Sequence, residues 1–178
     1  MKHCARSQKL LFFLLFCLVL AADVFLKLYV HQRIPLTNYP SPFPHGGIGV
    51  FENYWGISFS INHVLNKGAA WGTFSSYQTF LLILRIVIVG GMFVYIFIKK
   101  LQPLRILAFT LIIAGALGNI VDTFIYGYVI DMFHLQFGSY TYPIFNIADS
   151  SIVCGIILMC LDSAIAKRSQ SQSERISS

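Results

Sequence analysis

The chain has 178 residues, of which 56% are hydrophobic and 11% are charged, whereas about 25% of the residues of a soluble domain carry a charge. A water-facing domain of this size cannot bury so much apolar surface, because small domains keep a large share of their area exposed. This composition disfavours a soluble enzyme, a disordered protein and a disulfide-stapled secreted domain, and it predicts an integral membrane protein.

Four apolar stretches reach the length of about 20 residues that a membrane-spanning helix needs. In chain order they cover about residues 10–30, 79–98, 104–126 and 143–165. We therefore predict an all-α membrane protein with four transmembrane helices, forming a single integral membrane domain over residues 1–178.

The net charge of +6 comes from bases that flank these stretches. Nine of the thirteen Lys and Arg residues form three clusters: Lys2, Arg6 and Lys9; Lys99, Lys100 and Arg105; and Lys167, Arg168 and Arg175. By the positive-inside rule, both termini and the turn between the second and third spans lie in the cytoplasm. No basic stripe with interleaved aromatics is present, so a nucleic-acid partner is not expected.

The long outer loop, residues 31–78, differs in composition from the spans. It has a Pro/Gly-rich segment at 35–49, followed by Ile57–Ile61, in which apolar and polar residues alternate at the period of a β-strand. We predict a small β-element on the outer membrane surface, although an ordinary loop is an equal alternative. The Ser/Gln-rich tail, residues 167–178, is predicted to be disordered.

The seven acidic residues are placed unusually, because five of them lie within or close beside spans: Asp23, Asp122, Asp131, Asp149 and Asp162. An ionisable group in a span costs at least a few kcal/mol, so its default interpretation is functional. At a rise of about 1.5 Å per residue, all except Asp162 lie near the outer ends of their spans. We expect Asp23 and Lys27, at i and i+4, to neutralise each other.

Facing directions also favour a shared polar pocket. At about 100° per residue, one stripe of the third span and one face of the fourth are polar or small. Ala114 and Gly118 have the small-xxx-small spacing that allows helices to approach closely. The residues of the two faces are Gly115, Gly118, Asn119, Asp122 and Tyr126, then Asn146, Asp149 and Ser150.

Two carboxylates held together cannot both ionise cheaply, so one keeps its proton while the other acts as a base. Such a pair activates water for amide hydrolysis without a metal. Asp131 and Asp149 are the best candidates, since both lie at the outer boundary where water is available. Asp122 is predicted to be a supporting group. The amides of Asn66, Asn119 and Asn146 are suited to orient carboxylates or to bind a peptide backbone.

Three alternatives remain open from the residues alone. A small proton- or ion-coupled transporter also uses intramembrane acids, but these are expected at several depths rather than at one level. A carboxylate metal site is possible, but His134 lacks ligand spacing to the acids. A Ser/Lys hydrolase built from Ser150 or Ser151 with Lys27 would leave the acids unexplained.

Five segments resemble the motifs of a known family, in the family's order. They are Asp23-x-x-x-Lys27; Asn66-Lys67-Gly68-Ala69-Ala70-Trp71-Gly72; Gly115-Ala116-Leu117-Gly118-Asn119-Ile120-Val121-Asp122; Val129-Ile130-Asp131; and Phe145-Asn146-Ile147-Ala148-Asp149-Ser150. With the four spans they cover about residues 10–165. The sequence thus resembles lipoprotein signal peptidase (signal peptidase II), a family of membrane aspartic proteases of the bacterial inner membrane.

The resemblance implies an endopeptidase that removes the signal peptide of prolipoproteins just before a diacylglyceryl-modified cysteine. It implies that Asp131 and Asp149 are the catalytic dyad, supported by Asn66, Gly68, Asn119, Asp122, Asn146, Asp23 and Lys27. It further implies a monomer that contacts membrane lipid, no cofactor or metal, an active site near the outer leaflet and sensitivity to globomycin. An outer β-cradle and a short amphipathic helix near Ala69–Tyr77 are also expected.

The chain departs from the family pattern at three places. Thr123 stands where the third motif normally has Arg, and Val24 stands where the first usually has Gln. The Pro/Gly-rich segment at 35–49 is longer than usual. The missing Arg would pair with carboxylates or substrate, so the charge balance of the pocket is expected to differ here.

Overall fold

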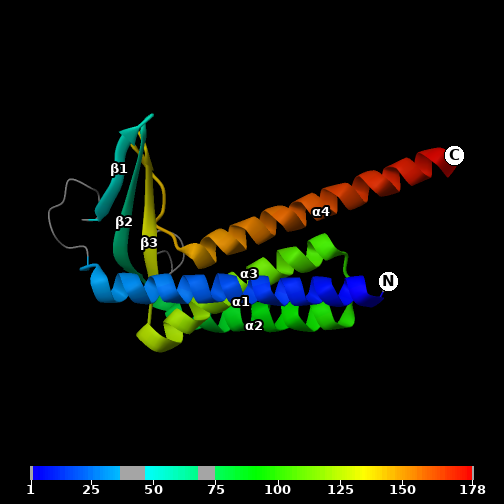
Figure 1. Ribbon diagram of the computed structural model, residues 1–178, viewed down its shortest axis with the longest axis horizontal. Coiled ribbons are helices and arrows are strands. Elements are labelled where there is room, and N and C mark those ends of the chain that lie inside the picture. Colours follow the sequence, from blue (N-terminus) through cyan, green and yellow to red (C-terminus); the bar gives the residue numbers. More distant parts are fainter. Residues whose placement is uncertain (1, 37–46, 68–74, 178) are drawn as a thin grey trace.

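The computed structural model describes residues 2–36, 47–67 and 75–177, and it contains four long helices (Figure 1). All four contain a segment long and apolar enough to cross a membrane, which confirms the four predicted spans. The helices are α1 (Lys2–Arg33), α2 (Gln78–Ile98), α3 (Pro103–Tyr126) and α4 (Ile147–Ser177).

Both ends of α4 differ from the prediction. The helix begins at Ile147 rather than at residue 143, because the backbone of Phe145 pairs in both directions with that of Phe133. It also continues to Ser177, so the prediction of a disordered tail is wrong for this structure. The tail contains no Gly or Pro to end the helix, and its Lys, Arg, Gln and Glu residues are good helix formers.

The fold is not all-α, because a four-stranded antiparallel sheet covers one end of the bundle (Figure 1). The predicted strand at 57–61 is confirmed as the first half of β2. The third strand was not predicted, because the sequence after the third span, Val129-Ile130-Asp131-Met132, does not alternate polar and apolar residues. In spatial order the strands are β1 (Ile48–Tyr54), β2 (Ile57–Asn66), β3 (Val129–Phe137) and β4 (Tyr140–Thr141).

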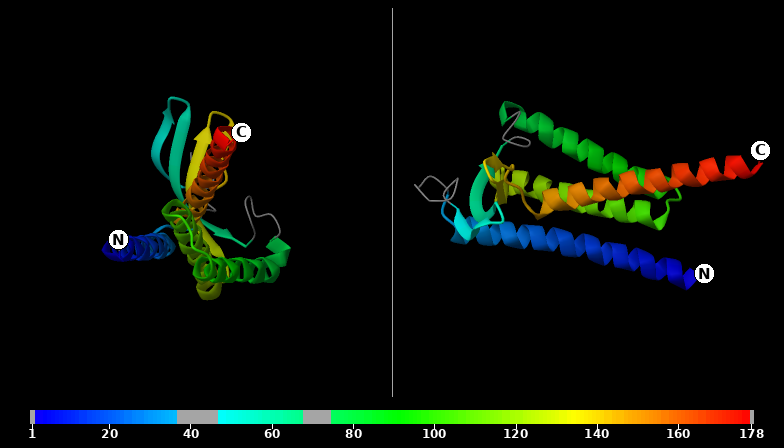
Figure 2. Two further views of the ribbon diagram at one scale, coloured as in Figure 1. Left: turned by 90° about the vertical axis from the view of Figure 1, so that its right-hand side faces the viewer. Right: turned by 90° about the horizontal axis from the view of Figure 1, so that it is seen from above.

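Helix α3 is the centre of the bundle and packs against α4, α1 and α2 (Figure 2). Two glycines make its contacts with α4 and α1 close. A Cβ at Gly115 would lie 2.3 Å from the backbone oxygen of Ala148, and one at Gly118 would lie 2.5 Å from Asp23 Oδ2. The predicted small-residue face of α3 is therefore the surface on which the polar ends of α1 and α4 meet.

The end of α3 is also fixed locally. Gly127 follows it with φ of 78°, a left-handed conformation that glycine adopts without steric cost. The chain then enters β3 directly, which brings a strand against the outer ends of α1 and α3. Of the predicted outer helix, Ser75–Tyr77 form a 3-10 turn, η3, and the rest lies outside the described residues, as do Gly68 and residues 37–46 of the Pro/Gly segment.

Candidate active site

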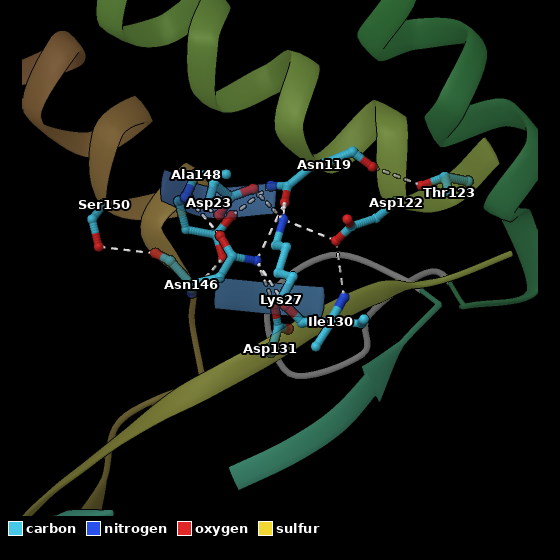
Figure 3. A network of polar contacts seen from close by, with 11 residues as sticks. Asp23, Lys27, Asn119, Asp122, Thr123, Ile130, Asp131, Asn146, Ala148 and Ser150 are labelled. Atoms are coloured by element: carbon cyan, nitrogen blue, oxygen red, sulfur yellow. Dashed lines mark hydrogen bonds and ion pairs between the residues drawn. The ribbon is translucent and has the colours of Figure 1, made fainter. Parts of the chain in front are cut away.

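A buried ammonium group holds three helical side chains together at the sheet end of the bundle (Figure 3). Lys27 Nζ lies 2.7 Å from Asp23 Oδ2 and 2.8 Å from Asp122 Oδ2. It also donates a hydrogen bond of 2.9 Å to Asn119 Oδ1. The predicted pairing of Asp23 with Lys27 is confirmed, and Asp122 is a second partner of the same cation.

The two carboxylates of this cluster also bind backbone groups. Asp23 Oδ1 accepts a hydrogen bond from the N–H of Ala148 at 2.8 Å, and Asp122 Oδ2 accepts one from the N–H of Ile130 at 3.1 Å. Ala148 precedes Asp149, and Ile130 precedes Asp131. The ion cluster thus fixes the backbone immediately before each of the two remaining acids.

Asp149 is positioned by a reciprocal cap at the start of α4. Asn146 Oδ1 accepts the N–H of Asp149 at 2.8 Å, and Asp149 Oδ2 accepts the N–H of Asn146 at 3.3 Å. This is the capping-box arrangement, with Asn at the cap and an acid three residues later. The N-terminus of α4, which carries partial positive charge, therefore lies against the Asp149 carboxylate.

Asp131 is positioned by the sheet and by two amides. It pairs with Val64 of β2, next to a bulge in which the register shifts between Ile61 and Val64. Asn66, two residues further along β2, donates from Nδ2 to Asp131 Oδ2 at 2.8 Å. On the other side, Asn146 Nδ2 donates to Asp131 Oδ1, also at 2.8 Å.

Two asparagines connect the acids into one network. Asn119 Oδ1 accepts hydrogen bonds from Lys27 and from Asn146 Nδ2, so its own Nδ2 faces Asp149 and donates to Oδ1 at 2.8 Å. Asn146 contacts Asp149 through its backbone and Asp131 through its side chain. The two carboxylates therefore lie on either side of one asparagine, within the polar pocket that depth and facing direction predict.

A cavity of about 350 Å³ opens over these two acids. Asp131 is buried, with 2% of its surface exposed, whereas Asp149 is half-buried. Burial, with the Asp149 charge as the next cause, raises the pKa of Asp131 from 3.8 to about 7. The cavity is lined by Asn66, Arg85, Asn119, Val129, Asp131, Asp149, Ile152, Val153 and the segment 142–145.

This geometry provides the half-buried carboxylate of Asp149 beside the buried carboxyl of Asp131, whose raised pKa favours its protonated form more than in a free Asp. Such a pair can take a proton from water and give one to a carbonyl oxygen, the requirements of metal-free amide hydrolysis. Among the described residues no group of three or more His, Cys, Asp and Glu side chains is placed to hold a metal ion.

A sequence profile described as Signal peptidase (SPase) II matches residues 15–165. The chain belongs to the signal peptidase II family. A lipoprotein signal peptidase of Chlamydia pneumoniae is 35% identical over 84% of this chain and 86% of its own length. One from Lactococcus lactis is 34% identical over 85% of this chain and 92% of its own.

Solved structures agree with the sequence relatives. A bacterial membrane enzyme determined by the in meso method at 2.3 Å has a TM-score of 0.68 and 31% identity, covering 90% of both chains. Another, at 1.9 Å, has a TM-score of 0.66 and 33% identity, covering 85% of this chain and 90% of its own. The protein is a multi-pass membrane enzyme, an aspartic peptidase of the signal peptidase II family that cleaves the signal peptides of prolipoproteins.

The structure brings together almost every side chain that the sequence singled out for this signal peptidase site. Asp131, Asp149, Asn66, Asn119, Asn146, Asp122, Asp23 and Lys27 form one connected network of ion pairs and hydrogen bonds. Gly68 lies outside the described residues. Asp162 is separate, as predicted, and its partner is Arg105, whose Nε donates to Oδ2 at 2.7 Å.

The alternative of a Ser/Lys hydrolase has no geometric support. Ser150 Oγ donates to the backbone oxygen of Asn146, and Ser151 Oγ donates to that of Leu111. The Lys27 ammonium is engaged by two carboxylates and one amide instead. A lysine in this state is a fixed counter-ion rather than a general base.

One cavity residue was missed by the sequence reasoning. Arg85 lies in the middle of the apolar α2 segment and lines the same cavity as the two acids. The sequence already marks Arg85 as a candidate, because a charged residue within a span is functional by default.

Proposed function

We propose that Asp131 and Asp149 are the catalytic dyad of this signal peptidase. The observation that carries the proposal is their shared asparagine: Asn146 contacts both carboxylates, at the floor of a cavity large enough for a peptide segment. Asn66 donates a hydrogen bond of 2.8 Å to Asp131 Oδ2, and Asn119 donates one of 2.8 Å to Asp149 Oδ1. The asparagine amides that fix the acids are neutral, so the two carboxylates can share a proton.

In the proposed reaction Asp149 is the base and Asp131 carries the shared proton. The raised pKa of Asp131, about 7, favours its protonated form, and the N-terminus of α4 favours negative charge on Asp149. Asp149 takes a proton from water, whose oxygen attacks the scissile carbonyl carbon. Asp131 hydrogen-bonds the carbonyl oxygen and stabilises the tetrahedral oxyanion. Collapse breaks the C–N bond, and the amine leaves with the proton held by Asp149.

We further propose that the cleaved bond precedes a diacylglyceryl-modified cysteine. The cavity is bordered by Ile152 and Val153 of α4 and by the aromatic segment 142–145, which are apolar surfaces at the membrane boundary. A substrate whose lipid chains remain in the bilayer can present its peptide to this cavity from the side. Globomycin would then be a ligand of the same cavity, and the enzyme would act as a monomer in contact with lipid.

The orientation proposed for the chain follows from its basic clusters. Lys99 and Lys100 lie in the turn between α2 and α3, and Lys167 lies in the C-terminal half of α4. The α2–α3 turn and the C-terminal half of α4 are at the end of the bundle opposite the sheet (Figure 1). The positive-inside rule assigns this end, with both termini, to the cytoplasm. The dyad then lies near the outer leaflet of the inner membrane, where translocated prolipoproteins emerge.

The dyad is tested with the purified protein in detergent and a diacylglyceryl prolipoprotein, followed by a gel shift. We expect Asp131→Asn and Asp149→Asn each to lower kcat by at least about 10³-fold, because loss of either member of a proton-sharing pair stops acid–base chemistry. Asp162→Asn is the matched control, since Asp162 is an acid of α4 bonded to Arg105 away from the cavity. Parental activity in either dyad variant would overturn the proposal.

A further inference from the structure

Arg85 is the one arginine among the described residues that line the cavity of the dyad. It is half-buried in α2, which is otherwise an apolar, largely lipid-facing helix. A charged side chain inside a span is costly and persists where it faces a cavity or a compensating charge. Arg85 meets this condition because it lines the cavity that contains Asp131 and Asp149.

Arg85 also lies at the same depth as the polar network. It is two turns from the start of α2 at Gln78, and Asn119 is two turns from the end of α3 at Tyr126, which at about 1.5 Å per residue is about 10 Å in each case. The two helix ends are joined, because Gln78 Nε2 donates to the backbone oxygen of Gly127. The guanidinium thus belongs to the level of the dyad.

The charges around the cavity explain why a second cation is tolerated. Lys27 bonds to both Asp23 and Asp122, which leaves one negative charge on that cluster when both acids are ionised. The two carboxyl groups of the dyad, when they share one proton, carry a second negative charge. Arg85 lines the same cavity from α2 and brings positive charge to this region of net negative charge.

We propose that Arg85 is a substrate-positioning residue, which binds backbone carbonyl oxygens of the signal peptide on the α2 side of the scissile bond. The inference rests on the dyad proposed above. The cavity is lined by Arg85 from α2, by Asn119 and the two acids, and by Ile152 and Val153 from α4. A peptide in this cavity therefore meets the dyad and, from α2, a planar group with five hydrogen-bond donors that suits carbonyl oxygens.

Thr123 gives a second reason to assign this role to Arg85. The family's third motif normally has Arg at that position, and here the Thr123 hydroxyl is turned to its own helix, donating to the backbone oxygen of Asn119 at 2.9 Å. Position 123 is one turn from Asn119 on the same face of α3. In this chain the second cation at the level of the dyad, beside Lys27, comes from α2 instead.

The test compares Arg85→Gln with the parent enzyme on the same prolipoprotein. We expect kcat/KM to fall at least about 10-fold, as for loss of a hydrogen bond to a charged group. The loss should appear in KM, with kcat within about 2-fold, because a carbonyl away from the scissile bond is bound alike in ground and transition states.

Two further variants make the result specific. Arg105→Gln is the matched control, because Arg105 is bonded to Asp162 at the other end of the bundle and should leave KM unchanged. Arg85→Gln combined with Thr123→Arg should regain most of the lost affinity, since it returns a guanidinium to the same level from α3.

The outcomes separate this inference from the dyad. Parental KM in Arg85→Gln, a shifted pH profile with unchanged KM, an equal loss in Arg105→Gln, or no recovery in the double variant would each overturn the role of Arg85. None of these results touches the dyad, which fails only if Asp131→Asn or Asp149→Asn remains active.

Discussion

Two pairs of aspartates lie at the same end of this bundle and differ in what stands between them. Asp23 and Asp122 have the Lys27 ammonium between them, at 2.7 and 2.8 Å. Asp131 and Asp149 have the Asn146 amide and backbone between them instead. The cation fixes the charge of the first pair, whereas a neutral bridge leaves the second pair free to share a proton.

The Lys27 ion cluster supports the dyad of Asp131 and Asp149. Asp23 and Asp122 also accept hydrogen bonds from the N–H groups of Ala148 and Ile130, the residues just before Asp149 and Asp131. Lys27 also fixes the direction in which the Asn119 amide points toward Asp149. The ion cluster is therefore a rigid support for the dyad, and its own acids do not need access to water.

The largest effect is expected from removing the central cation. Lys27→Met leaves Asp23 and Asp122 buried without their counter-ion, which costs about 3–5 kcal/mol when one partner of a buried pair is lost. For a chain of this length that corresponds to a fall in Tm of roughly 10 °C. Thermal unfolding in detergent, monitored by tryptophan fluorescence, measures it.

A compensated variant provides the control for this prediction. Lys27→Met combined with Asp23→Asn and Asp122→Asn removes the uncompensated charges and should recover most of the lost Tm. If the triple variant is no more stable than Lys27→Met, the ion pairs are not the reason for the destabilisation. If Lys27→Met unfolds at the parental temperature, the cluster does not stabilise the bundle.

Much of this arrangement could be predicted from the sequence, because helical periodicity and depth suffice to place side chains within a span. Asn119 and Asp122 share a face of α3, and the Asn146-x-x-Asp149 spacing is that of a helix cap. Both features depend on residues close in sequence. The same local reasoning correctly paired Asp23 with Lys27.

The remaining features depend on contacts between distant segments. Asp122 bonds to Lys27 of another helix, and the pairing of Phe145 with Phe133 delays the start of α4. Strand β3 is continuous with the end of α3 and alternates poorly, since Val129, Ile130, Asp131 and Met132 are all buried. No periodicity marks such a strand, so a sheet at this end was foreseen only around residues 57–61.

The start of α4, which carries Asp149, packs closely against Gly115 of α3. A smaller effect should follow from disturbing this contact. A Cβ at Gly115 would meet the backbone oxygen of Ala148 at 2.3 Å, so Gly115→Ala must push the start of α4 away. We expect a loss of about 1–3 kcal/mol of stability, as for overpacking. Activity should fall by about 10–100-fold, because Asp149 would move relative to Asp131.

Gly90→Ala is the matched control for Gly115→Ala. Gly90 is also a glycine in the middle of a span, but a Cβ there meets nothing within 4 Å. Its replacement should leave activity unchanged and slightly raise Tm, since Ala is the better helix former by about 1 kcal/mol. Equal losses in both variants would mean that the close α3–α4 contact has no special role in placing the dyad.

The smallest effect concerns the pH dependence of stability, which should differ between the two pairs. The pKa of Asp131 is raised by burial from 3.8 to about 7 in the folded protein. The stability contributed by its protonated form is therefore fully present below about pH 4 and is lost as the pH rises through about 7. Asp131→Asn cannot ionise and should be more stable than the parent at pH 8.

The measurement is the Tm of the parent and of Asp131→Asn at pH 4.5 and pH 8 in the same detergent. The difference between the two proteins should be larger at pH 8, because only the parent must then hold an ionised carboxylate against the charge of Asp149. Asp162→Asn supplies the contrast, since the Asp162 carboxylate is bonded to the Arg105 guanidinium. Asp162→Asn should therefore be less stable than the parent at pH 8. If Asp162→Asn and Asp131→Asn gained equal stability at pH 8, the Asp131 site would not resist ionisation.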